Sequence, residues 1–388
     1  MDHGSHVLAL NSGSSSLKFG LYRVRSLHAE RLISGAAEGL GQSKSSFHAS
    51  DARGQTLLQE TAPLASQQEA VVRLGSLLAA SRTPAPQAIG HRIVHGGPTL
   101  LQHCRIDDGV LHALEAATAF APLHTPAALA VIGYALTHFP GVPQVACFDT
   151  TFHMRMPQIA RVLPLPAAMR SQGLQRYGFH GLSCESIVQQ LAGALPSRVM
   201  VAHLGNGASI TAVKDGVSID TSMGLTPSGG VIMGTRSGDL DPGVLVYLAR
   251  EQHFDAAMLE DLVDHRSGLL GISGLSGDMR ALHDAAASNA DAQLAIQMFC
   301  YAVIKQLGAM SMVLDGVDLI VFTGGIGEND ALVRAGVCAG LSTLGVELDE
   351  ARNGAAESLI SGTGSRCQVR VLPSLEDAQI ALHAAVLA

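Results

Sequence analysis

Long hydrophobic runs, paired cysteines and an excess of positive charge are all missing from this 388-residue chain. No uninterrupted apolar run approaches the roughly 18 residues that span a bilayer, so we expect no membrane partner. The net charge of −8 argues against a general surface for nucleic acid. The first letters, MDHGSH, lack the apolar core of a signal peptide, so we expect a cytoplasmic location.

The cysteines exclude two further kinds of site. None of the six forms a C-x-x-C pair, and their spacing matches no zinc pattern. We therefore expect reduced, partly buried thiols of a cytosolic protein. The pattern offers no support for a catalytic cysteine.

Two standard phosphate-binding motifs are absent as well. Gly13 and Lys18 lack Walker A spacing, and GGIGE at 324–328 lacks dinucleotide spacing, so NAD is not indicated. Small-residue turns nevertheless follow apolar strands at 11–16, 205–207 and 324–327. One such turn is typical of any hairpin. Together they favour nucleotide binding, because their backbone N–H groups can form a nest for an anion.

Composition and length predict a two-domain α/β enzyme. Hydrophobic residues make up 47% of the chain and charged residues 15%, which suits a well-buried globular protein. A chain of 388 residues is long for one core. Asn11 and Asn206 follow similar strands, 206 − 11 = 195 residues apart, which indicates a weak internal repeat. We predict one domain over 1–150 plus a C-terminal helix at 374–388, and a second domain over 151–373.

Periodicity predicts the main elements. The expected elements are a hairpin at 7–22, short strands or loops at 35–61, helices at 68–80 and 125–136, strands at 88–97 and 143–153, three strands at 198–221, and a strand, glycine-rich turn and helix at 318–330. Ser374 and Asp377 form an S-x-x-D start for the last helix.

Charged side chains in unusual settings are candidates for chemistry. Arg92 and Arg236 lie within glycine-rich segments and His180 lies in RYGFHGLS, where cations are well placed to meet anions. Taken alone, each of these three residues is more typical of an ordinary surface or core residue whose hydrogen bonds are made within the protein or with water. Asp149 ends a buried strand, a common ligand-facing position, although it could equally cap the next turn. Glu376, by itself, is a favourable acid at a helix N-terminus.

Taken as a set, the segments resemble the acetate kinase family. The matching segments are NSGSSSLKF, GHRIVHGG, APLHTPAAL, CFDTTFH, RYGFHGLS, AHLGNGASITAVKDG, DTSMGLTPSGGVIMGTRSGDLDPG, SGDMR and FTGGIGEN. The resemblance implies an ATP:acetate phosphotransferase of the actin, sugar-kinase and heat-shock ATPase fold. That fold has two similar ribonuclease H-like domains with an interdomain nucleotide cleft. A homodimer is implied too.

The resemblance also implies roles for individual residues. The catalytic residues would be Asp149 as the catalytic acid, His180 as transition-state stabiliser, and Arg92 and Arg236, which would hold the carboxylate and the phosphoryl group. Val94, Leu123, Phe179 and Pro227 would form the acetate methyl pocket beside Arg92. ATP would meet Lys18, His203, Leu204, Gly205, Asn206, Gly207, Asp278, Met279, Arg280, Gly324, Gly325, Ile326, Gly327 and Glu328. Asn11 and Glu376 would support Mg²⁺, with Mn²⁺ as the alternative ion.

One segment departs from the family pattern. The family motif Thr-Asn-Glu-Glu is replaced by Ser374-Leu375-Glu376-Asp377. The first glutamate is kept as Glu376, but its neighbours differ, so the change falls on the segment expected to support the metal. The serine-rich hairpin at 11–18 is interpreted as a phosphate cradle. Asp149 is expected to orient Mg²⁺ or fix an arginine, since an acetate nucleophile, already ionised, needs no base.

Other functions stay open at this point. The nearest rival is a propionate or butyrate kinase, because one methylene changes discrimination by only roughly 1–3 kcal/mol. A sugar or glycerol kinase would need a base for a hydroxyl group. A chaperone-type ATPase would need a peptide-binding module, and only one helix follows residue 376.

Overall fold

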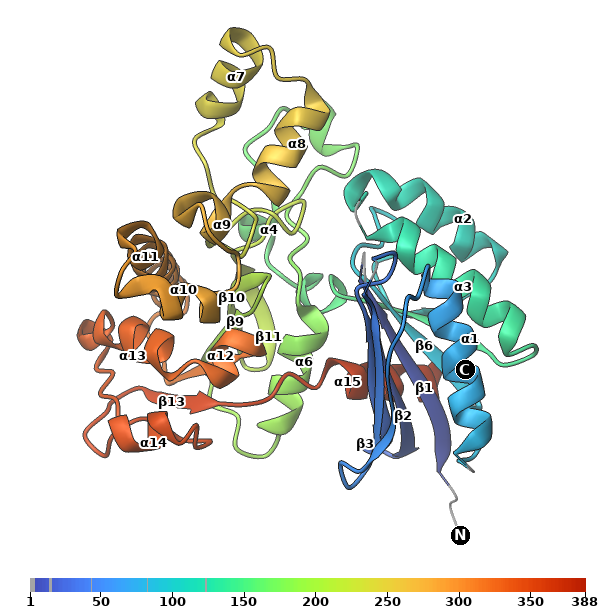
Figure 1. Cartoon of the computed structure of the whole chain (residues 1–388). Helices are drawn as coiled ribbons and strands as arrows, with labels where there is room; N and C mark the ends of the chain where they lie inside the picture. The colour runs from blue at the N-terminus through green and yellow to red at the C-terminus, as the bar shows by residue number, and fades with distance from the viewer. Residues whose placement is uncertain (1–3, 14–15, 43, 82, 123) are drawn as a thin grey trace. The chain divides into compact units, whose positions relative to one another are not determined.

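This computed structural model describes residues 4–388 apart from 14, 15, 43, 82 and 123. The chain divides into two compact units. Unit 1 comprises Met1–Thr151, Gly181–Ser186 and Leu375–Ala388, and unit 2 comprises Phe152–His180 and Ile187–Ser374. The C-terminal helix, red in Figure 1, therefore belongs with the blue N-terminal strands.

Unit 1 is built on a mixed sheet with the strand order β5-β4-β3-β2-β1-β6-β8-β7. Strands β1 to β5 form an antiparallel meander, and β1, β6 and β8 run parallel. The strands are β1 (Ser5–Ser12), β2 (Ser16–Arg25), β3 (His28–Glu38), β4 (Ser46–Asp51), β5 (Thr56–Thr61), β6 (Ala88–Ile93), β7 (Cys104–Arg105) and β8 (Gln144–Phe148). Its helices are α1 (Gln67–Ala80), α2 (Asp108–Ala116), η1 (Ala117–Phe120), α3 (Thr125–His138) and α15 (Glu376–Leu387).

Unit 2 repeats the central part of this topology. Its sheet has the order β11-β10-β9-β12-β13, with β9, β10 and β11 antiparallel and β9, β12 and β13 parallel. Strands β3-β2-β1-β6-β8 of unit 1 have the same order and directions, which confirms the expected internal repeat. The strands are β9 (Arg198–Leu204), β10 (Ala208–Lys214), β11 (Val217–Thr221), β12 (Leu319–Thr323) and β13 (Gln368–Val371).

The remaining helices lie mainly in unit 2. They are η2 (Thr151–His153), α4 (Gln158–Arg161), α5 (Ala167–Arg170), α6 (Gly181–Gln190), α7 (Pro242–Glu251), α8 (Ala256–His265), α9 (Gly268–Ser273), α10 (Met279–Ala286), α11 (Ala290–Val313), α12 (Gly324–Asn329), α13 (Ala331–Ala339), η3 (Ser342–Leu344) and α14 (Glu350–Gly354). Helix α6 begins in unit 1 and ends in unit 2.

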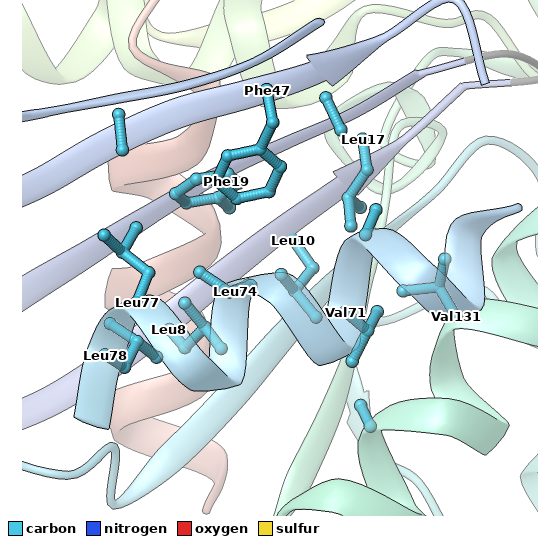
Figure 2. Packing of buried hydrophobic residues seen from close by; sticks show 14 of the residues in the cluster. Leu8, Leu10, Leu17, Phe19, Phe47, Val71, Leu74, Leu77, Leu78 and Val131 are labelled. Atoms are coloured by element: carbon cyan, nitrogen blue, oxygen red, sulfur yellow. The ribbon is translucent and has the colours of Figure 1, made fainter. Parts of the chain in front are cut away.

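Helix α1 covers one face of the unit 1 sheet. Ser66 caps its N-terminus by accepting from the N–H of Glu69, and its apolar stripe faces the strands. Figure 2 shows Val71, Leu74 and neighbouring side chains of this stripe against leucines and phenylalanines of the sheet. This packing helps to set the register of β1 and β2, because a shift of one residue would turn the leucines to the opposite face of the sheet.

Helix α15 covers the opposite face of the same sheet. Ile380 is completely buried among β1, β6 and β8, which stabilises the unit by roughly 2 kcal/mol. Gly90 lets the helix approach closely, since an added Cβ would lie 2.4 Å from Cγ2 of Ile380. This packing holds the first turn of α15, with Glu376 and Asp377, against the sheet.

The hairpin, both expected helices and the strand trio at 198–221 are confirmed, but two local expectations were wrong. The region 35–61 contains the end of β3 and two short strands, β4 and β5, joined by loops, as expected. Gly324 begins α12 directly, so the glycines form a helical turn rather than a separate loop. Leu375, not Ser374, is the residue before α15, and it makes no side-chain cap.

Helix α11 also differs from expectation. It is long and apolar enough to cross a membrane by length and composition, although no uninterrupted apolar run marks it. Phe299, Val303 and Leu307 are fully buried, and the helix packs against α9, α10, α13 and β10. One face of α11 thus packs into the core of unit 2, while 28% of its apolar window is buried. The expected thiols are confirmed, since all six cysteines are free and five are buried.

Candidate active-site groups

A buried ion pair joins the ends of two adjacent parallel strands in unit 1. Arg92 lies in β6, and Asp149 follows β8 directly. Nε of Arg92 donates to Oδ2 of Asp149 over 2.8 Å, and Nη2 donates to the same oxygen. Burial works against the charge on Arg92, but the carboxylates of Asp149 and Glu376 raise its pKa. The guanidinium is therefore held as a fixed cation.

The other carboxylate oxygen of Asp149, Oδ1, accepts no such hydrogen bond within the described part of the chain. Asp149 is completely buried, and its Oδ1 has no hydrogen-bond partner among the described residues. Burial raises the pKa of Asp149 to about 6, while Arg92 opposes the shift. A buried, partnerless carboxylate oxygen is costly unless another cation meets it.

Asn11 and Glu376 extend this cluster. Nη1 of Arg92 donates to Oδ1 of Asn11 over 3.3 Å, and Nδ2 of Asn11 lies 3.5 Å from Oε2 of Glu376. Oxygens of Asp149 and Glu376 are the hard donors that Mg²⁺ prefers. The residues present therefore fit a divalent cation, and the free Oδ1 is the observation that supports it.

Asp377 completes the acidic side of this cluster and was not assigned a role from the sequence. Burial raises the pKa of Asp377 to about 6, and the neighbouring Glu376 adds to the shift. Lys18 and a hydrogen bond to Asn11 act in the opposite direction. The aspartate thus lies beside the groups expected to support the metal. The replacement of the family glutamate keeps an acid at this place.

A second group of expected residues gathers in unit 2. His180 has a left-handed backbone with φ of 56° immediately before α6, and its Nδ1 lies 2.9 Å from Oγ of Ser209. Such a conformation in a non-glycine residue is strained and is concentrated at functional sites. An added Cβ on Gly207 would lie 3.3 Å from both Nε2 of His180 and Nη2 of Arg236. The side chains of His180 and Arg236 therefore flank the glycine turn after β9.

Further contacts hold these two side chains in place. Nη1 of Arg236 donates to the carbonyl of Pro227 over 2.7 Å. The rings of His180 and His203 stack with centroids 4.0 Å apart. The expected ATP residue His203 thus touches the expected transition-state stabiliser.

The glycine turns of β9 and β12 also meet. An added Cβ on Gly324, whose φ is +79°, would lie 2.8 Å from the carbonyl of Leu204 and 3.2 Å from Nε2 of His203. Gly327 also lies near Leu204, so three of the predicted ATP residues form one tight backbone junction. Only glycine fits at Gly324, on steric and conformational grounds.

The carboxylate of Glu328 is occupied within the protein. Its Oε1 accepts from the N–H of Gly324 and from the N–H of Ser374, each over 2.9 Å. Glu328 therefore acts on the shape of the loop through its carboxylate.

Beside this junction lies a cavity of about 860 Å³ in unit 2. Its walls include Gly205 and Asn206 from one turn, Asp278, Met279 and Arg280 from the start of α10, and Gly325 and Ile326 of α12. Leu204, Gly207, Gly324, Gly327 and Glu328 are outside that lining. Nη2 of Arg280 pairs with Oδ2 of Asp278 over 2.7 Å, and this contact lowers the pKa of Asp278. A volume of this size suits a nucleotide-sized ligand.

Sequence reasoning missed several residues of this cavity. His283, Asp284, Asn329, Asp330, Ala331 and Leu332 also line it. Nε2 of His283 lies 2.8 Å from Oδ2 of Asp330. A signal was present, because Arg280, His283 and Asp284 have the i, i+3 and i+4 spacing of one helix face.

Not all the residues expected around an acetate methyl group can be described. Val94 and Phe179 are buried, in unit 1 and unit 2 respectively. The carbonyl of Phe179 is 2.9 Å from Nε2 of His153. Leu123 lies outside the described residues.

Comparison with known proteins identifies the family of this chain. Residues 6–382 match the model of the acetokinase family. The chain belongs to the acetokinase family. It is 41% identical to the acetate kinase of Nitrobacter hamburgensis, over 97% of this chain and 95% of that protein. It is 42% identical to that of Heliobacterium modesticaldum, over 97% of each chain.

Solved structures give the same assignment. The fold matches the acetate kinase of Porphyromonas gingivalis with a TM-score of 0.87 and 36% identity, covering 99% of this chain and all of that one. It matches a propionate kinase from Francisella tularensis with a TM-score of 0.92 and 35% identity over the same shares. The expected family and two-part α/β kinase fold are thereby confirmed, and an ATP-using phosphotransferase is established at the family level.

Proposed function

We propose that this protein transfers a phosphoryl group reversibly between ATP and acetate, giving ADP and acetyl phosphate. The observation that carries the proposal is the Arg92 guanidinium, fixed by Asp149 at the edge of a sheet beside Asn11 and Glu376. A fixed guanidinium can bind a carboxylate or a phosphoryl oxygen in a defined orientation. This chemistry agrees with the activity named for the curated relatives.

The main obstacle to this reaction is charge repulsion. An acetate oxygen attacks the γ-phosphorus while the bond from that phosphorus to the β,γ-bridging oxygen breaks, and ADP leaves. Acetate is already ionised at neutral pH, so no base has to remove a proton. At roughly 4 Å and an effective dielectric constant of about 20, two unit charges of the same sign repel by about 4 kcal/mol. Cations held in advance reduce this repulsion.

The chain has suitable cations in each unit. Arg92 of unit 1 would orient the carboxylate, and Arg236 of unit 2 would hold the phosphoryl oxygens. His180, beside Gly207, would stabilise the charge that develops during transfer. Asp149 would position Arg92 instead of transferring a proton, which its direct hydrogen bonds to the guanidinium support.

Asn11 and Glu376 would hold Mg²⁺, with Mn²⁺ as the alternative ion. The partnerless Oδ1 of Asp149 supports a cation at this place. When bound, the metal would neutralise phosphate oxygens of ATP. Lys18 would add a positive charge on the phosphate side of the β1–β2 hairpin. If the assignment is correct, Glu376→Gln raises the Mg²⁺ concentration for half-maximal activity, whereas Glu115→Gln on exposed α2 leaves it unchanged.

The nucleotide would occupy the cavity of unit 2. Asn206 and the Asp278–Arg280 segment would face ribose or phosphate, and Gly325 and Ile326 would face the base. The fit is supported by the volume of about 860 Å³ and by the mixture of backbone and charged groups in its walls. We assign acid binding to the domain formed by 1–150 and 374–388. We assign nucleotide binding and dimer formation to the domain at 151–373.

Hydroxylamine trapping of acyl phosphate tests the function. The purified protein receives ATP, Mg²⁺ and, at equal concentrations, formate, acetate, propionate or butyrate. The highest kcat/KM with acetate supports the proposal. Absence of acyl phosphate with every acid, despite ATP binding measured by calorimetry, would refute it.

A propionate kinase is the second candidate. It is favoured by the close structural match to the Francisella tularensis propionate kinase. The residues expected around the acid would then leave room for one more methylene group. A kcat/KM maximum at propionate in the same assay would keep the mechanism and change the preferred acid.

We also propose a cytoplasmic homodimer. Leu294, Met298 and Tyr301 are exposed along one face of α11, at i, i+4 and i+7 spacing. A second copy of the chain would cover this apolar face. Light scattering should give twice the monomer mass of 40.2 kDa, and Tyr301→Glu should shift it toward the monomer. An unchanged mass for the variant would show that the dimer interface does not include this face of α11.

A further inference from the structure

Three titratable side chains gather in unit 1 apart from the groups described above. His103 directly precedes β7, Glu185 lies in the first part of α6, and His383 lies on α15. Each offers one ligand atom, and these atoms all lie within 4.8 Å of one another. The three side chains are partly buried.

A histidine, a glutamate and a second histidine could in principle hold zinc. The hydrogen bonding of His103 argues against this. Its Nδ1 accepts from the backbone N–H of Phe148 over 3.0 Å. Because a backbone N–H can only donate, the neutral ring carries its proton on Nε2. A zinc-bound histidine has the reverse arrangement, with the free ring nitrogen donating to an acceptor.

The histidines have partners in the protein without a metal. Oε2 of Glu185 is within hydrogen-bond distance of Nε2 of His383, at 2.9 Å, and 3.9 Å from Nε2 of His103. The two rings lie against each other with centroids 4.0 Å apart. Burial opposes ionisation, but the two neighbouring histidines lower the pKa of Glu185 to about 2. The carboxylate is therefore ionised, and it accepts a hydrogen bond from His383.

Each member of this cluster is tied to an element that carries a reacting group. Phe148, whose N–H binds His103, is followed directly by Asp149. His383 lies seven residues after Glu376 on α15, about two helical turns along the same face. Glu185 follows Gly181, whose N–H donates to the carbonyl of Asp149 over 2.8 Å.

We propose that His103, Glu185 and His383 form a metal-free triad, joined by the hydrogen bond between His383 and Glu185 and by the contact of the two rings, that positions Asp149 and the first turn of α15 for phosphoryl transfer. They are positioning residues, since Phe148 and α15 lie between them and the groups that would meet the reactants. The proposal rests on the proposed function. A misplacement of about 1 Å can lower a rate roughly 100-fold, so a link between β8 and α15 has kinetic consequences.

Paired substitutions at His103 separate positioning from general stability. His103→Leu removes the hydrogen bond from the N–H of Phe148 and the polar contact with Glu185. His103→Asn places Oδ1 near the position of Nδ1, so it can still accept from the N–H of Phe148, but it loses the link to Glu185. His383→Leu removes the link from α15. His112→Leu is the matched control, because His112 faces Glu115 in an exposed pair on α2.

The kinetic readout is kcat, KM for ATP and the Mg²⁺ requirement in acyl phosphate formation. We expect His103→Leu and His383→Leu to lower kcat at least tenfold, with KM for ATP within twofold of wild type. His103→Asn should recover a large part of the kcat that His103→Leu loses, while both variants lose thermal stability to a similar degree. Kinetics equal to those of His112→Leu for both leucine variants would overturn the proposal.

Two further measurements do not depend on activity. Nitrogen-15 NMR of the imidazoles should show His103 with its proton on Nε2, and calorimetry with Zn²⁺ alone should show no site that His383→Leu removes. A proton on Nδ1, or tight Zn²⁺ binding that disappears in His383→Leu, would overturn the triad. A wild-type protein that forms no acyl phosphate would refute the proposed function and the positioning role together, while the NMR result would still report the triad separately.

Discussion

Arg92 and Asp149 are joined through one carboxylate oxygen only. Both Nε and Nη2 of the guanidinium donate to Oδ2 of Asp149, while Oδ1 stays without a partner among the described residues. One aspartate can thereby orient an arginine and present a second oxygen to a cation. Adjacent parallel strands β6 and β8 bring the two residues together.

Asp149→Asn tests this relationship. The amide keeps the size of the carboxylate but removes its charge, so Arg92 and the metal both lose a partner. We expect kcat to fall at least about 100-fold, the scale of losing a major electrostatic contact, with a normal circular dichroism spectrum. Asp108→Asn on exposed α2 is the control. A variant that keeps more than a tenth of the wild-type kcat would contradict the assignment.

Gly207→Ala tests the spacing of the cations in unit 2. The added Cβ would come within 3.3 Å of Nη2 of Arg236 and Nε2 of His180, which forces one of them to move by a few tenths of an ångström. We expect roughly a tenfold loss of kcat from this displacement. Gly224→Ala is the matched control, because no atom lies within 4 Å of its added Cβ. Equal kinetics for the two variants would show that His180 and Arg236 tolerate the shift.

Arg334 holds the carboxyl-terminal part of α12 in place. It is 1% exposed, and it donates to the carbonyls of Gly327, Glu328 and Asn353 and to Oδ1 of Asn353 over 2.8–3.0 Å. Removing the guanidinium would leave these buried acceptors without a donor.

Arg334→Met should therefore lower the free energy of unfolding by about 3 kcal/mol and raise KM for ATP more than KM for acetate. Urea unfolding and steady-state kinetics measure the two effects. Arg198→Met removes a partly exposed arginine that pairs with Asp318 and serves as the control. Equal increases of both KM values would mean that Arg334 does not act specifically on nucleotide binding.

His91 makes stability depend on pH in a defined direction. The side chain is buried against Gln144, and burial lowers the pKa of His91 to about 4 from an ordinary value of 6.5. Below pH 6.5 the imidazole of His91 binds a proton in the unfolded chain, whereas it stays neutral in the folded chain until the pH approaches 4. The contribution of His91 is therefore complete above pH 6.5 and is lost as pH falls to about 4, amounting to roughly 3 kcal/mol.

The test compares wild type with His91→Gln by urea unfolding between pH 7 and pH 4.5. Buried His153, Asp149 and Asp377 also titrate, but they are common to both proteins. The difference in unfolding free energy between the proteins should shrink by about 1.4 kcal/mol for each pH unit below pH 6. A difference that stays constant over this range would show that His91 does not titrate as a buried neutral group.

Much of this protein could be predicted from local sequence. Alternation of apolar residues predicted the β1–β2 hairpin and the trio β9, β10 and β11, and helical spacing predicted α1 and α3, because each pattern reflects burial of one face. The segments around Arg92, His180 and Arg236 were recognisable from their composition and order. The region at 35–61 was harder, since its strands depend on pairing with neighbours rather than on apolar alternation.

Tertiary structure decided which distant residues meet. Asn11 and Glu376 are 365 residues apart, and they approach because α15 returns to pack on the first sheet. The same return places His383 beside Glu185 and His103. Local patterns determined strands, helices and many candidate residues. The pairing of Arg92 with one oxygen of Asp149, the left-handed backbone of His180 and the cavity at α10 and α12 arise only from packing, because long-range burial and strand order set those distances.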